Sequence, residues 1–187
     1  AGLGAGHDRP QGAVDVVVCD GALGQRDVDL AAVMSLAVVV DDHLGGQQEG
    51  RIELLRTAFS PEKLVDEVRR FFQFEAEDKG LTLRTTIDPP VPDVVYGDET
   101  RVRQILFNLV SNALKFTREG EVEIRLQSEA HYENEAHLRF TIRDTGPGLS
   151  ESQIERVFEP YMSSKRRGSG LGLTVCWMLI TQLGGHI

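Results

Sequence analysis

The clearest pattern of apolar and polar positions begins near residue 59 and predicts a helix followed by a strand. Ser60-Pro61 has the form of a helix start, with serine as the N-cap and proline in the first turn. Apolar residues then recur at three- and four-residue spacing as far as Phe72, and Gly80 is expected to end the helix. A strand is expected over 81–87, where apolar and polar residues alternate.

Similar signals continue toward the C-terminus. Asp98 is the predicted N-cap of a helix that runs to about Thr117, and alternation over 121–127 and 137–143 predicts two strands joined by a polar loop. A short helix is expected from Ser150 to Val157, and a last helix from about Gly170 to Leu183. This mixture predicts an α+β fold: an α/β sandwich with a mixed, mostly antiparallel sheet covered on one face by helices.

The first 55 residues carry weaker patterns. Val14–Cys19 is a short β-like run. Apolar residues at helical spacing over 28–44, followed by Gly45 and Gly46, predict a helix, although its valines lower the helix propensity. We therefore expect residues 1–55 to form an N-terminal segment and residues 56–187 to form the main domain.

Composition and charge narrow the function classes. The chain of 187 residues has 20 basic and 29 acidic side chains, a formal net charge of −9, which disfavours non-specific binding to nucleic acid or anionic lipid. The longest apolar run, 31–40, is about half of what a membrane-spanning helix needs. Cys19 and Cys176 lack metal-ligand spacing and are expected to be free thiols. These features predict a cytoplasmic segment with no membrane contact of its own.

Three polar residues share one stripe of the helix predicted after Asp98. Asn108, Asn112 and Lys115 stand at positions i, i+4 and i+7, away from the apolar face. An asparagine oxygen is a hard ligand that suits Mg²⁺, and a lysine adds a positive charge for phosphates. A solvated helix face has the same pattern, so the stripe alone leaves both interpretations open.

Two glycine-rich segments add candidate ligand contacts. Asp144-Thr-Gly-Pro-Gly148 follows a predicted strand, where the aspartate is placed to accept a hydrogen bond from an adenine amino group. Residues 168–173, Gly-Ser-Gly-Leu-Gly-Leu, open the last helix, where backbone N–H groups can converge on phosphate oxygens. No Lys-Ser or Lys-Thr pair follows the glycines, so this is not a Walker loop.

Taken in order, segments 108–117, 144–148, 158–161 and 168–173 resemble the four boxes of the ATP-binding catalytic domain of sensor histidine kinases, in the Bergerat ATPase superfamily. Segment 78–101 is similar to what precedes the first box in hybrid sensor kinases. The resemblance covers residues from about 50 to 187 and implies the Bergerat ATP-binding fold. It also implies a two-component signalling protein that binds ATP and Mg²⁺ and transfers the γ-phosphate to a histidine.

The resemblance implies a role for each matching residue. Asn112 matches the magnesium ligand, Asn108 and Lys115 match catalytic residues near the phosphates, and Phe116 matches an aromatic that lies against the nucleotide. Asp144 matches the residue that reads adenine. The other implied nucleotide-binding positions are Gly146, Gly148, Tyr161, Lys165, Gly168, Ser169, Gly170, Leu171, Gly172 and Leu173. Hydrolysing relatives carry a glutamate where this chain has Asn108; a carboxamide is no general base, which favours transfer over hydrolysis.

The sequence departs from the family pattern at both ends. The upstream phosphoacceptor box is not found, and His7-Asp-Arg-Pro10 matches only a shortened form of it, so the dimerisation hairpin within 1–55 is expected to be degenerate or truncated. His43 lacks the acidic neighbour of an acceptor histidine. The family has one more strand after the position of Ile187, so we expect the domain to lack its last strand and to leave a sheet edge open.

The resemblance also implies partners. One is a response regulator or a phosphoacceptor hairpin domain. Another is a second copy of the chain, bound through the N-terminal segment of the full-length protein. The family also allows the full-length protein to carry a membrane anchor. Two alternatives stay open: a non-transferring ATP-binding module that controls a partner kinase, and a serine kinase of the anti-sigma type. Phosphate transfer to a supplied hairpin domain would separate the first alternative from a histidine kinase.

Overall fold

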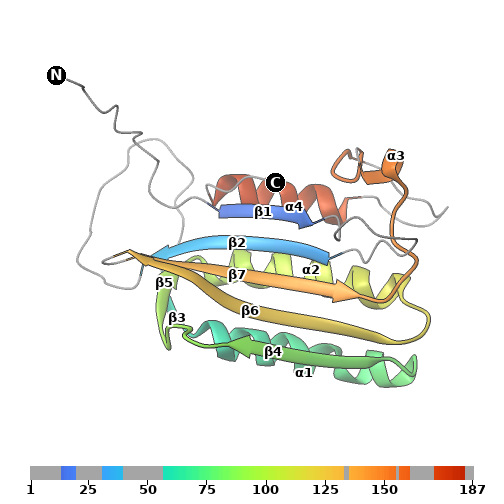
Figure 1. Ribbon diagram of the computed structural model, residues 1–187, viewed down its shortest axis with the longest axis horizontal. Coiled ribbons are helices and arrows are strands. Elements are labelled where there is room, and N and C mark those ends of the chain that lie inside the picture. Colours follow the sequence, from blue (N-terminus) through green and yellow to red (C-terminus); the bar gives the residue numbers. More distant parts are fainter. Residues whose placement is uncertain are drawn as a thin grey trace.

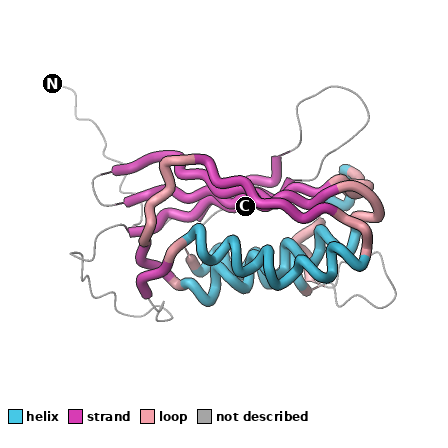
Figure 2. Tube along the Cα trace, turned by 90° about the horizontal axis from the view of Figure 1, so that it is seen from below, coloured by secondary structure: helices cyan, strands magenta, loops and turns pink. Residues whose placement is uncertain are grey.

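The computed structural model has a twisted sheet whose one face is covered by helices, as Figure 1 and, from below, Figure 2 show. It describes residues 14–19, 31–39, 57–132, 135–154, 156–160 and 171–183. Two long helices, α1 (Pro61–Asp78) and α2 (Glu99–Phe116), lie under the sheet with α4 (Gly172–Gln182), and α3 (Glu151–Ile154) is a single short turn. This arrangement confirms the predicted α+β sandwich.

Local sequence signals set the ends of the two long helices. The Ser60 hydroxyl accepts from the Lys63 amide at 3.5 Å, and the Asp98 carboxylate accepts from the Arg101 amide at 3.1 Å, so both predicted N-caps are confirmed. Beyond α1, Gly80 adopts φ 69°, a conformation that favours glycine. The helix predicted over 150–157 is shorter than expected, since α3 spans only Glu151–Ile154. Among the described helices, none is both long and apolar enough to cross a membrane.

The strands form a mixed, mostly antiparallel sheet, as predicted. Its order is β3 (Thr57–Phe59), β5 (Val95–Gly97), β2 (Ala31–Val39), β7 (Glu135–Asp144), β6 (Glu121–Tyr132) and β4 (Thr82–Asp88), with β1 (Val14–Cys19) paired to β2. Only the β4–β6 pair is parallel among the described pairs.

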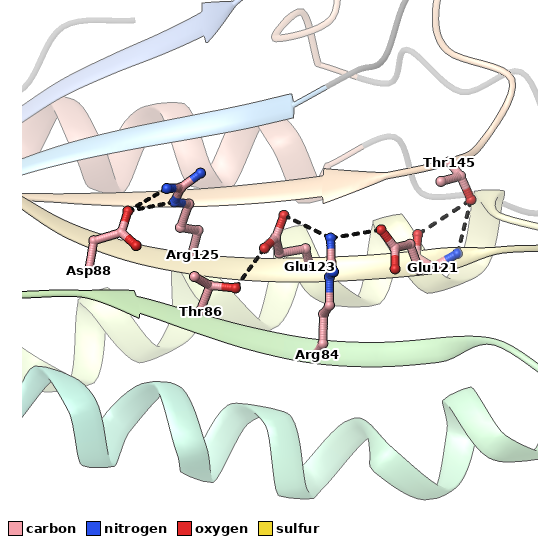
Figure 3. A network of polar contacts seen from close by, with 7 residues as sticks. All are labelled: Arg84, Thr86, Asp88, Glu121, Glu123, Arg125 and Thr145. Carbon is pink, nitrogen blue, oxygen red and sulfur yellow. Dashed lines mark hydrogen bonds and ion pairs between the residues drawn. The ribbon is translucent and has the colours of Figure 1, made fainter.

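Alternation along β6 and β7 separates a buried face from a charged one. Val122, Ile124, Leu126, Leu138, Phe140 and Ile142 are buried in the core with the apolar stripes of the helices. On the neighbouring strands β4 and β6, Arg84 pairs with Glu121 at 2.9 Å and Arg125 with Asp88 at 2.6 Å, as Figure 3 shows. The helices therefore cover the apolar face, and ion pairs join the strands at the other positions.

The prediction of a helix over 28–44 is wrong. Ala31–Val39 is strand β2, which pairs antiparallel with β7 from Ala31↔Arg143 to Val39↔Glu135. The physical reason is that a continuous apolar run rich in valine fits the period of a helix as well as that of a strand. The backbone groups of β7 then offer this run a ladder of hydrogen bonds. β1 forms over the predicted residues Val14–Cys19. The domain division at residues 55–56 and the missing last strand stay predictions, and His7 and His43 lie outside the described residues.

Candidate functional site

The helix α2 carries a second stripe besides its buried one. Asn108 and Asn112 are half-buried on it, while Lys115 and Phe116 are exposed at the C-terminal end of the helix. The Lys115 Nζ lies 5.2 Å from the centroid of the Phe116 ring, which is within the range of a cation–π contact. The stripe thus offers two carboxamides, a cation and an aromatic surface along one side of the helix.

Asp144 lies at the C-terminal end of β7, next to the end of α2. Its carboxylate Oδ1 accepts a hydrogen bond from the Gly146 amide at 2.8 Å and from the Thr117 hydroxyl at 3.2 Å. Thr117 is buried, and its hydroxyl also donates to the Ala113 carbonyl at 2.7 Å. The end of a strand and the end of a helix, separated by a whole hairpin in sequence, are joined at this carboxylate.

Gly146 fits this junction because it has no side chain. A Cβ atom there would lie 2.5 Å from Asp144 Oδ1, and 3.5 Å from both the Phe116 carbonyl oxygen and Thr117 Oγ1. Gly148, two residues on, has φ 67° and so adopts a backbone conformation that L-residues rarely take. Steric exclusion and backbone conformation thus explain the two glycines of this segment.

The start of α4 lies against the C-terminal half of α2. A Cβ atom on Gly172 would be 3.6 Å from Asn112 Nδ2, so the two helices approach closely at this asparagine. Leu171 precedes the helix and is exposed, and the half-buried Leu173 packs against the core. The N-terminal end of a helix carries partial positive charge, which favours an anion next to Asn112.

Cys176 of α4 lies beside the other asparagine. Its thiol is 3.9 Å from the Ile105 carbonyl oxygen of α2. Burial raises the pKa of the Cys176 thiol to about 12, partly opposed by a hydrogen bond with the Asn108 side chain. The thiol is therefore protonated near neutral pH and contributes no negative charge to the site.

The structure brings most of the described candidates together around α2. One side of this helix carries the stripe residues. Asp144 and Gly146 lie at its C-terminal end, and Gly172 approaches it at Asn112. The candidates outside the described residues are Tyr161, Lys165, Gly168, Ser169 and Gly170, with the neighbouring Arg166 and Arg167. Their roles stay predictions.

Sequence reasoning assigned no role to Thr117 or Cys176, although both contact candidate residues. Thr117 carries one signal in the sequence, since it stands where the predicted helix ends and a hydroxyl there can bond the last turn. Its contact with Asp144, 27 positions away, has no sequence signal.

The residues present suit a magnesium ion that a bound nucleotide helps to hold. Among the described residues, no group of three or more histidine, cysteine, aspartate or glutamate side chains is arranged around a common point. Asn112 lies beside the start of α4, with its Nδ2 toward Gly172, and its carboxamide has one oxygen to offer a metal. Mg²⁺ commonly binds proteins through one or two oxygen ligands and completes its shell with phosphate oxygens and waters. A single asparagine therefore fits a nucleotide-borne magnesium better than a metal held by the protein alone.

Comparisons with known proteins identify the family of the chain. A family model described as histidine kinase-, DNA gyrase B-, and HSP90-like ATPase matches residues 97–187. The signal transduction histidine-protein kinase BarA of Escherichia coli is 34% identical over 161 residues, covering 82% of this chain and 18% of BarA.

Solved structures give the same relationship. The nucleotide-free catalytic domain of histidine kinase ThkA is 30% identical with a TM-score of 0.53, covering 69% of this chain and 82% of that domain. Full-length ShkA, solved with AMPPNP, is 32% identical with a TM-score of 0.62, covering 72% of this chain and 28% of that one. The chain spans from 7% to 23% of the length of the first curated relatives it matches.

Proposed function

We propose a function for this chain from its family: it belongs to the histidine kinase-, DNA gyrase B- and HSP90-like ATPases, and among them it is a histidine kinase catalytic domain. It binds ATP with Mg²⁺ and transfers the γ-phosphate to a histidine. The acceptor belongs to a hairpin domain of a larger two-component sensor kinase. The relatives span many more residues than this chain, and in this proposal other parts of such a kinase supply the signal and the acceptor.

One observation carries the proposal. The carboxylate of Asp144 is fixed at one end of α2 by Thr117 and Gly146, while Asn112 meets the start of α4 along the same helix. An adenine amino group needs an acceptor, and phosphates need amides, cations and a metal. In this proposal the base lies at Asp144 and the phosphates extend along α2 toward Asn112 and Gly172.

The polar residues of α2 then divide the chemistry. Lys115 provides a point charge near the phosphates, and the exposed face of Phe116 provides a surface for the nucleotide. Bound magnesium neutralises phosphate charge, with Asn112 as its ligand from this chain. The basic residues Lys165, Arg166 and Arg167 and the glycines before α4 are proposed to approach the phosphates.

Asn108 favours transfer over hydrolysis. Water must lose a proton to attack a phosphorus atom, and a carboxamide does not take one near neutral pH. The neighbouring Cys176 thiol is held protonated by its raised pKa of about 12, so it does not supply the base either. We expect positioning and charge neutralisation to carry the reaction, with a histidine of the partner domain as the nucleophile.

Calorimetry followed by a transfer assay tests the proposal. We expect ADP and ATP to bind in the micromolar range or more weakly, ATP more tightly with Mg²⁺, and labelled phosphate to reach a supplied hairpin domain as an acid-labile, base-stable product. An Asn112→Asp variant is the control for the metal. Absence of binding to either nucleotide by the folded protein would refute the assignment. Binding without transfer would instead support the non-transferring regulatory module.

A response regulator is the proposed downstream partner. ThkA, which resembles this chain at 28% identity and a TM-score of 0.53 in that complex, was solved with the response regulator protein TrrA. A phosphohistidine formed on the hairpin domain is the chemical group that such a partner would accept.

A further inference from the structure

We propose that Thr117 is a positioning residue for adenine recognition, holding the Asp144 carboxylate in place through its hydroxyl. The inference rests on the proposed function, because it assumes that Asp144 reads the base. It adds a residue of the helix α2 to the adenine end of the site. It also means that α2, which carries Asn112 and Lys115, helps to hold the carboxylate that recognises the base.

The position of Thr117 is fixed independently of Asp144. It is the residue immediately after α2 and its side chain is buried, with 5% of its surface exposed. Its backbone amide donates to the Ala113 carbonyl at 3.0 Å, and its hydroxyl lies 2.7 Å from the same oxygen. A threonine anchored twice to the last turn of a helix has little freedom to move its hydroxyl.

The same hydroxyl lies 3.2 Å from Asp144 Oδ1. A threonine hydroxyl has one hydrogen, so Ala113 and Asp144 compete for it as acceptors. The Ala113 carbonyl already receives the Thr117 amide, whereas the charged carboxylate gains more from a donor than a neutral carbonyl does. The shorter distance, 2.7 Å, favours the carbonyl and the charge favours the carboxylate, so both acceptors share the hydroxyl proton in a three-centre hydrogen bond.

Thr117 and Gly146 reach Oδ1 from different elements. The Gly146 amide, 2.8 Å from Oδ1, comes from the turn after β7, while Thr117 comes from the end of α2. One donor restrains the carboxylate in distance, and two donors from separate elements also restrain its rotation about χ2. Loss of the hydroxyl would remove the restraint that comes from α2 and weaken the alignment of the carboxylate.

Thr145 provides a matched control one residue from Asp144. Its hydroxyl lies 2.9 Å from the Glu119 carbonyl oxygen, in the turn before β6, and accepts from the amide of Glu121, the first residue of β6, at 3.0 Å, as Figure 3 shows for Glu121. Thr145→Val removes a hydroxyl close to Asp144 in sequence but acts on a different part of the structure.

The experiment compares the dissociation constants of ADP and inosine diphosphate by calorimetry without Mg²⁺. Inosine carries a carbonyl in place of the adenine amino group, so the ratio of the two constants reports on the carboxylate. We expect Thr117→Val to weaken ADP binding about tenfold with little effect on inosine diphosphate, since a hydrogen bond to a charged group is lost. Thr117→Ser should restore the ratio, and Thr145→Val should leave it at the wild-type value.

Several outcomes would overturn the proposal. An unchanged ratio in Thr117→Val, or equal loss in Thr117→Ser, would mean that the hydroxyl does not act through Asp144. Thr117→Ala replaces Thr117→Val, with the same criterion, if valine unfolds the protein as judged by circular dichroism. Wild-type protein that binds both nucleotides equally would remove the base-reading role but keep nucleotide binding. Wild-type protein that binds neither would refute the proposed function itself.

Discussion

Replacement of Gly146 by alanine is expected to disable the site while leaving the fold almost intact. The added Cβ would lie 2.5 Å from Asp144 Oδ1, about 1 Å inside ordinary van der Waals contact. The backbone itself accepts alanine, because the positive φ angles of the described glycines occur at Gly80, Gly120 and Gly148. The overlap is relieved by turning the Asp144 carboxylate, the far end of its side chain, away from its hydrogen-bond donors.

The magnitude follows from what the displaced carboxylate loses. It gives up the Gly146 amide and the alignment with Thr117, and it can no longer meet an adenine amino group. One hydrogen bond to a charged group contributes about 1.5–3 kcal/mol, so the Kd for ADP should rise about ten- to hundredfold. The free energy of unfolding should fall by only about 1 kcal/mol, because the carboxylate regains water.

Gly80→Ala is the matched control with the opposite pattern. Gly80 has φ 69° and no atom within 4 Å of a Cβ placed there, so alanine causes backbone strain but no clash. We expect a loss of about 1 kcal/mol in stability and an unchanged Kd for ADP. Calorimetry with ADP and thermal unfolding by circular dichroism measure both quantities. Wild-type affinity in Gly146→Ala, or an equal loss of affinity in Gly80→Ala, would refute this account of the site.

Three further predictions test other parts of the structure. Asn112→Asp should weaken binding of ATP with Mg²⁺ more than binding of metal-free ADP. Asp144→Asn should weaken binding of metal-free ADP about tenfold. Equal losses of metal-free ADP binding in both variants would contradict the separate roles. In a Cys19→Ser background, the buried Cys176 thiol, whose pKa is raised to about 12, should resist a disulfide reagent at mildly alkaline pH until the protein is unfolded; fast labelling of native protein would show that it is accessible. The hydrogen bond from Arg103 lowers the pKa of Glu67, so this pair stabilises the fold above the ordinary glutamate pKa and loses that effect as pH falls through the lowered value. Glu67→Gln should therefore reduce stability at neutral pH by no more than about 1 kcal/mol, and chemical denaturation should show the difference disappearing in acid; a difference independent of pH would contradict the ion pair.

Much of the fold was predictable because its signals are local. The N-caps Ser60 and Asp98, the stop at Gly80 and the alternation along β6 and β7 each depend on residues within a turn or two. The spacing of Asn108, Asn112 and Lys115 likewise predicted their common side of α2. Order and spacing of short motifs then implied the family, which the comparisons confirm.

The sequence by itself determined these caps, periods and motifs, whereas the tertiary structure decided which segments meet. The apolar run 31–39 fits a helix or a strand, and it became strand β2 because β7 presents backbone groups that need partners. The contact between Thr117 and Asp144 joins positions 27 apart through the return of a hairpin. Such contacts depend on the packing of whole elements against each other, and neither side chain carries a local pattern that names its partner.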